Sequence, residues 1–349
     1  MKLTRAMLDE AAGKGLLDEG QAGRLWQFLA EREQHTPGFK PAHILYYLGG
    51  MVAIGAMSLF MTEGWESFGG SGLLFISLCY MVAAIGAVEV LRARGLQLPA
   101  GVLAALAVVL VPLAVYGLQH VLGLWPGTHE EWGYRDYHRY IDWRWVLMEL
   151  ATLAAGAAVL WRYRMPFTVM PVAVTLWYMS MDVTTMLLGG SSYQFFSHEG
   201  KVISAVFGVA MTLIALWVDL RNRSDKDFAF WLYIWGVLTF WGGLSAIDSG
   251  SELGKLVYCL VNLLMIGIGA ALSRRVFAVF GALGVAGYLG HLSHSVFRDS
   301  LLFPLALTAI GIAIIAAGVF WQRHEAAIGA SLRQWLPEQL RMLVLRRAA

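Results

Sequence analysis

Charged residues are scarce in this 349-residue chain. It holds 26 Lys and Arg and 24 Asp and Glu, together 14% of the sequence, while 58% is apolar. Soluble proteins average about 25% charged and about 45–50% apolar residues. So few charges could not cover the surface of one to three soluble domains, and a disordered or collagen-like chain is excluded on the same grounds. The composition predicts an all-α, polytopic integral membrane bundle.

Cysteine is also rare, and both copies, Cys79 and Cys259, lie inside apolar runs. They resemble small hydrophobic residues and exclude a disulfide framework. The chain has no GxxxxGK[ST], HExxH, GxSxG or CxxC motif. We therefore predict no catalytic residue and no cofactor, and the absence of these motifs argues against an enzyme. A net charge of +2 gives no indication of nucleic-acid binding.

Long apolar runs are abundant. A bilayer core about 30 Å thick is crossed by about 20 residues of helix, and ten runs are long enough. Because their separators are short, neighbouring spans are expected to be antiparallel. The predicted spans are 42–62, 71–91, 98–122, 144–161, 166–188, 201–220, 228–247, 253–272, 275–294 and 300–321. They form a predicted transmembrane domain over residues 42–321.

The basic residues predict the orientation of these spans. With the N-terminus inside, 20 of the 26 Lys and Arg fall on inner segments. An excess of Lys and Arg marks cytoplasmic loops. The sequence therefore predicts that both termini are cytoplasmic. The six outer basic residues are Arg135, Arg139, Arg144, Lys201, Lys255 and Arg298.

Residues 1–41 are predicted to be a cytoplasmic helical hairpin, broken near Gly15 and capped again at Asp18. About 30 residues are too few for an independent core. The apolar stripe must therefore dock on the inner ends of the spans, a second copy, lipid, or a cytoplasmic protein that binds residues 1–33. The stripe comprises Ala22, Leu25, Trp26, Phe28 and Leu29.

Two other segments are predicted to lie at the membrane surface. The tail 322–349 interleaves leucines with arginines and is typical of an amphipathic helix in the inner interface. The outer loop 123–143 is rich in aromatic residues. It is either an interfacial loop or a lid over an outward cavity that offers Trp125, Trp132 and Tyr134 to a ligand.

The N-terminal sequence GLLDEGQA at residues 15–22, followed by a first span that closes with Gly64 and Trp65, resembles one bacterial family. Its members are predicted polytopic membrane proteins known only as a domain of unknown function. The resemblance covers roughly the first 90 residues. It implies a location in the bacterial inner membrane and carries no activity or site residues.

Small residues give two further predictions. Gly281, Gly284 and Gly287 lie within one apolar span, where small residues let helices pack closely, and Gly242 with Gly243 is interpreted in the same way. Spans one to four and seven to ten also share a weak pattern. This is either a parallel internal repeat or the ordinary similarity of Gly- and Ala-rich helices.

Ionisable residues inside spans are costly and are functional candidates by default. Counting residues from the span ends places one set in the outer third of the membrane. Asn262 falls at mid-depth, and Glu89 near an inner end is expected to pair with Arg92. Pro171 is expected to kink its span below Asp182. The outer set comprises Glu149, Asp182, His291, His294, His120 and His198.

This outer layer allows several chemistries. It can bind a polar solute or ion, carry protons, or bind a metal through His291 and His294, and each residue can instead be a satisfied interfacial group. We expect Asp182, Glu149, His291 and His294 to face the bundle interior, with at least two within reach of a hydrogen bond or a water bridge. The predicted function is a transporter-like or solute-binding membrane protein. The alternative is a non-catalytic sensor or assembly protein acting through the N-terminal segment.

Overall fold

The computed structural model describes residues 8, 11–15, 17–18, 20–25, 41–125, 143–188, 197–222, 224, 226–247, 249–292, 305, 308, 311–312, 316 and 319. The regular elements in this part of the chain are helices, and none of it is strand. The predicted all-α class is therefore confirmed for these residues. Trp26, Phe28, Leu29, nearly all of the tenth predicted span and the tail 322–349 lie outside them.

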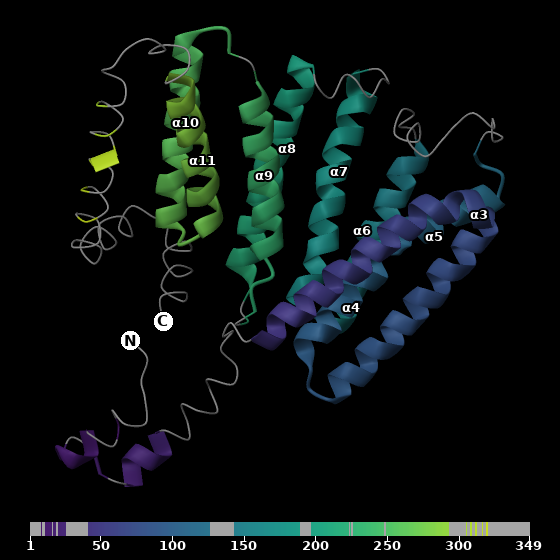
Figure 1. The fold of residues 1–349 in the computed structure, drawn as a ribbon, viewed down its shortest axis with the longest axis horizontal. Helices are drawn as coiled ribbons and strands as arrows, with labels where there is room; N and C mark the ends of the chain where they lie inside the picture. The colour runs from purple at the N-terminus through teal and green to yellow at the C-terminus, as the bar shows by residue number, and fades with distance from the viewer. Residues whose placement is uncertain are drawn as a thin grey trace. The chain divides into compact units, whose positions relative to one another are not determined.

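The helices follow one another along the chain (Figure 1). They are α3 (Pro41–Ala93), α4 (Gln97–Val109), α5 (Val111–Val121), α6 (Trp143–Tyr163), the short 3₁₀ helix η2 (Pro166–Thr168), α7 (Val169–Leu188), α8 (His198–Arg221), α9 (Phe230–Ala246), α10 (Glu252–Ala271) and α11 (Arg275–His291). The chain divides into two units, Met1–Leu48 and Gly49–Ala349.

In the first unit, residues 11–13 and 20–25 are helical, and Leu8 and Ala22 are buried. The turn between them passes through Gly15, whose φ of 71° suits glycine. The amide N–H of Asp18 donates to Oε1 of Gln21 at 3.3 Å. The break and the second helix start are thus where the sequence places them.

The first large helix, α3, reverses direction at one residue. Gly69 has φ 59° and ψ −176°, a backbone conformation that is open essentially to glycine alone. Residues 63–68, which the sequence analysis assigns to a loop, continue the first helix instead. One glycine therefore replaces the predicted separator, and the two arms of α3 form a hairpin (Figure 1).

Five helices among the described residues are long and apolar enough to cross a membrane. They are Phe68–Ala93, Gln97–Val121 (α4 with α5), α6, α8 and α10. The apolar helices α9 and α11 are shorter, with 17 residues each. These helices coincide with predicted spans.

The outer faces of these helices are apolar. Within the most apolar 18-residue windows of α6, α8 and α10, only 22% of the residues are buried inside the molecule. Leu213 on α8 is 59% exposed and Leu264 on α10 is 63% exposed. Apolar area of this extent is unfavourable in water, at roughly 25 cal/mol per Å², and is favourable against lipid chains.

Among the described residues, prolines lie near helix starts, and Pro112 separates α4 from α5 within one predicted span. Pro112 is the second residue of α5, where the chain passes from α4 through Leu110. Pro166 opens η2, and Pro171 lies in the first turn of α7. First-turn amides have no partner inside the helix, so proline costs little there. The predicted kink below Asp182 is therefore wrong, because Pro171 is at the helix start.

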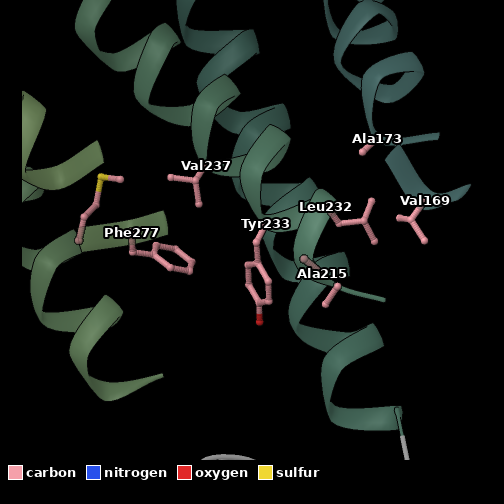
Figure 2. Packing of buried hydrophobic residues seen from close by; sticks show 9 residues of the cluster. Val169, Ala173, Ala215, Leu232, Tyr233, Val237 and Phe277 are labelled. Carbon is pink, nitrogen blue, oxygen red and sulfur yellow. The ribbon is translucent and has the colours of Figure 1, made fainter. Parts of the chain in front are cut away.

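Buried apolar clusters hold the described helices of the second unit together, and two of them are the larger ones. One joins α4, α5 and α6 to α3 through Leu73, Leu106, Leu110, Leu113, Tyr116 and Met148. The other cluster joins the five helices from α7 through α11, and Tyr233 lies at its centre. Figure 2 shows the ring of Phe277 on one side of Tyr233 and Leu232, Val169 and Ala173 on the other.

Glycines allow the closest helix crossings. A Cβ on Gly208 of α8 would lie 2.8 Å from the carbonyl oxygen of Gly236 on α9 and against the backbone of Phe240. On α11, a Cβ on Gly281 would meet the backbone of α10, and one on Gly284 would meet Asn262. The predicted packing role is thus confirmed for Gly281 and Gly284.

We predict that Gly208→Ala lowers the stability of the purified protein by about 1–3 kcal/mol, because the added methyl group forces α8 and α9 apart. Gly242→Ala is the matched control, since a Cβ there meets nothing within 4 Å. Thermal unfolding in detergent measures both. Equal melting temperatures for the two variants would contradict the close crossing.

Candidate functional site

The central feature of the candidate site is a pair of buried carboxyl groups, Glu149 and Asp182. Glu149 lies in the second turn of α6, and Asp182 lies near the end of α7. The helices are antiparallel neighbours, so these positions are level with each other. Glu149 is 7% exposed and Asp182 is 6% exposed. The two carboxyl groups are close enough to interact electrostatically with each other.

Such an approach of two carboxyl groups favours a bound proton. An ionised carboxylate only accepts hydrogen bonds, and two adjacent like charges repel each other. Neither oxygen of Glu149 receives a hydrogen bond from an N–H or hydroxyl group among the described residues. The contact is therefore favourable when one carboxyl group donates its hydrogen to the other, and the two side chains act as one proton-binding unit.

Hydroxyl groups surround the pair but are committed to their own helices. Thr152 donates to the carbonyl of Met148 at 2.7 Å, and Thr184 donates to that of Ser180 at 2.7 Å. Such bonds to the preceding turn are common for Ser and Thr in apolar helices. Because these hydroxyl hydrogens bond to backbone carbonyls, they do not neutralise the charge of either carboxyl group. Ser180 and Thr185 make similar bonds to Trp177 and Met181.

The predicted histidines do not join this pair. His291 is the last residue of α11, and its Nε2 lies 3.3 Å from Oε1 of Glu252, the first residue of α10. Lys255 pairs with the same oxygen at 2.8 Å. His198 is exposed in the first turn of α8. His120 packs edge-on against Tyr116 at the end of α5, with ring centroids 5.7 Å apart. The partner that the structure gives His291 is therefore Glu252 and not Asp182.

His294 lies outside the described residues. Within the described ranges, no group of three His, Cys, Asp or Glu side chains is arranged to hold a metal ion. The structure therefore leaves the carboxyl pair as the polar feature with the clearest chemistry.

A small network covers the end of α5 and the start of α6, about one turn from Glu149. Trp125 donates through Nε1 to Oε1 of Gln119 at 3.2 Å, and Gln119 donates through Nε2 to the carbonyl of Arg144 at 3.1 Å. The Arg144 guanidinium lies 4.8 Å from the Trp125 ring centroid. Of the predicted lid residues, Trp125 thus holds the two helix ends together, while Trp132 and Tyr134 lie outside the described residues.

A second buried polar network was missed in the sequence. Arg274, just before α11, donates through Nη2 to Asp219 of α8 at 2.9 Å and binds Asp227 with two nitrogens. Tyr233 donates to Asp219 at 3.3 Å, and the Arg274 guanidinium lies 4.7 Å from its ring centroid. Phe277 packs edge-on against Tyr233. Opposite charges meet here, so this network ties α8, α9 and α11 together.

Asn262 of α10 is fully buried at mid-helix. Its Nδ2 donates to the Tyr258 carbonyl at 2.9 Å. Its side chain packs directly on Gly284, where a Cβ would overlap it. The predicted polar residue at mid-depth is thus part of the α10–α11 packing contact and is separate from the carboxyl pair.

We predict that Arg274→Ala destabilises the protein by about 3–5 kcal/mol, because it leaves the buried carboxylate of Asp219 without its cation. Arg275→Ala should change stability by less than about 0.5 kcal/mol, since Arg275 is the next residue in the chain but its side chain is exposed. Thermal unfolding of the two variants in the same detergent measures both changes in stability. A similar loss in both would show that the network is not stabilising.

Comparison of the chain with protein-family models, with curated proteins and with solved structures finds no match. The function is therefore argued from the residues and their geometry.

Proposed function

We propose that this chain is an integral membrane protein with ten spans and both termini in the cytoplasm, in the inner membrane of a bacterium. Two sets of contacts support alternating spans. The ends of α3 and α6 meet at Glu89, which pairs with Arg92 and Arg162. The end of α8 meets the α10–α11 connection through Asp219 and Arg274. In both places, basic ends of two helices lie on the same side, as the distribution of Lys and Arg requires.

Cysteine labelling tests this topology. In a background with Cys79→Ser and Cys259→Ser, single cysteines at Glu66, Tyr137 and Ser249 should react with a membrane-impermeant maleimide added outside the cell. A cysteine at Arg223 should react only after the membrane is opened. External labelling at Arg223 would overturn the topology.

We further propose that the protein is transporter-like and that Glu149 and Asp182 bind and release a proton during its cycle. The supporting observation is that two neighbouring carboxyl groups are both buried and that neither is paired with a cation among the described residues. A charged residue at the centre of a bilayer-spanning helix costs about 2.5–3.5 kcal/mol on insertion scales. Two acidic side chains in one layer are a poor solution for stability, because a pair of apolar residues would fill the same space at lower cost.

Proton exchange is the chemistry that this pair performs best. When one carboxyl group is protonated, its hydrogen bridges to the other, and the pair carries a single negative charge. When a cation or a second proton arrives, that charge is neutralised. A site of this kind can therefore couple the entry of a small cation or cationic solute to the loss of a proton, which is the role of acidic residues in many pumps and transporters.

Asp182→Asn tests the shared proton. The amide keeps the volume of the carboxyl group and can donate to Glu149, so we expect the fold to persist. Infrared spectroscopy of the purified protein should show a protonated-carboxyl carbonyl band in the parent protein, and this band should be lost in Asp182→Asn and in Glu149→Gln. Glu252→Gln is the control, because Glu252 is 62% exposed and ion-paired with Lys255. A band that persists in both variants would contradict the assignment.

Proton movement is measured separately. The protein is reconstituted into vesicles that contain a pH-sensitive dye, and a potassium diffusion potential drives protons inward. We expect faster internal acidification with the parent protein and with Glu252→Gln than with Asp182→Asn or empty vesicles. If the infrared band behaves as expected while all four samples acidify equally, the pair holds a proton only for structure and the transport proposal fails.

A further inference from the structure

A cluster of arginines lies where the second arm of α3 and helix α6 end. The two ends are held together by a buried apolar cluster that contains Val88 of α3, Ala100 and Ala104 of α4, and Met165, which follows α6. Gly95 then turns the chain with φ 76°, and Arg164 does so with φ 50°. Packing beneath the surface thus fixes the position of both helix ends.

Two of the arginines converge on one carboxylate. Arg92 Nη1 lies 3.5 Å from Oε2 of Glu89, and Arg162 Nη2 lies 3.5 Å from its Oε1. The predicted pair of Glu89 with Arg92 is confirmed, and Arg162 joins it from 73 residues away in the chain. Tyr163 donates to the same Oε1 at 2.9 Å. The guanidinium carbons lie 5.1 and 5.2 Å from the centroid of the Tyr163 ring.

The cluster carries more positive charge than Glu89 can balance. A charge-assisted hydrogen bond between nitrogen and oxygen is about 2.7–2.9 Å long, so contacts of 3.5 Å are loose. Each guanidinium has five N–H donors, and the Arg162 side chain is 58% exposed. Arg94 and Arg164 lie on the two adjoining turns. Four arginines and one glutamate give a formal charge of +3 on this surface.

The surroundings place this charge at the border of the apolar zone. Trp161, in the last turn of α6, is 82% exposed, and the neighbouring outward residue Val90 of α3 is 52% exposed. Exposed tryptophan beside arginine at the end of an apolar helix is the usual arrangement at the headgroup layer. The anion that is abundant in that layer is the phosphate of phospholipids.

We propose that Arg92 and Arg162 bind the phosphate of an anionic phospholipid, with the Tyr163 ring as a platform beneath the two guanidinium groups. Arginine offers paired N–H donors that match phosphate oxygens, and basic pockets between helix ends are typical sites for acidic headgroups. The site is separate from the carboxyl pair, and it depends only on the placement of these helices in a bilayer.

The test uses the full-length protein in mixed micelles that contain phosphatidylglycerol, phosphatidylcholine or inorganic phosphate at equal concentration. Native mass spectrometry counts bound lipid, and thermal unfolding measures the stabilisation. In Arg92→Gln/Arg162→Gln, the affinity for phosphatidylglycerol should fall about 30-fold, or about fivefold for each arginine. Arg221→Gln is the matched control, because Arg221 also ends an apolar helix but lies over Trp217 at 4.5 Å.

Three results would overturn the proposal. The double variant could keep the affinity of the parent protein, phosphatidylcholine could bind as well as phosphatidylglycerol, or inorganic phosphate could produce the whole stabilisation. Arg162→Gln alone guards against a folding defect, since it removes the more exposed arginine and leaves the Arg92–Glu89 pair in place. It should lose about fivefold in affinity, and no loss in this variant would also contradict the site.

Discussion

The exclusion of water from the helix bundle is the constraint on which the rest of the structure depends. An apolar exterior leaves polar groups no solvent partner, so each must find one inside the bundle. The backbone meets this demand by remaining helical up to single-residue turns such as Gly69. The hydroxyls of Thr152, Thr184 and Thr239 meet it by donating to the preceding turn of their own helices. Polar residues that do not follow this pattern call for a separate explanation.

Two buried ionisable groups contrast in how they meet this constraint. Arg274 has opposite charges on two sides, since Asp219 and Asp227 both accept its hydrogen bonds and Tyr233 lies beneath it. Attraction between these groups offsets part of their desolvation cost, and a role in stability accounts for them. Glu149 and Asp182 have like charges, and only a proton makes their contact favourable. Stability alone does not explain such a pair, which is why the proposed function is built on it.

Sequence reasoning reached the carboxyl pair because depth is readable from the chain. Glu149 and Asp182 lie at similar distances from facing ends of antiparallel helices, so their common level follows from counting. Depth does not give the direction in which a side chain points around its helix. His291 shares the level of Asp182 but faces Glu252. The Arg274 network was missed for a related reason, since Asp219 lies 55 residues away and both groups fall at span ends, where charges are ordinarily solvated.

The two ends of the bundle differ in what it would cost to open them, and this bears on the route of the proposed proton. Near Glu149, helices α5 and α6 are joined by the neutral hydrogen bonds of Gln119 and Trp125 and by the stacking of Arg144. Bonds of this type contribute about 0.5–1.5 kcal/mol each. At the other end, Arg274 joins α8 to the α10–α11 connection through a buried ion pair, and losing one partner costs about 3–5 kcal/mol. The end that holds Gln119 is also about one turn from the carboxyl groups. If the proposed proton exchange takes place through that end, it requires the smaller rearrangement and leaves the Arg274 network intact.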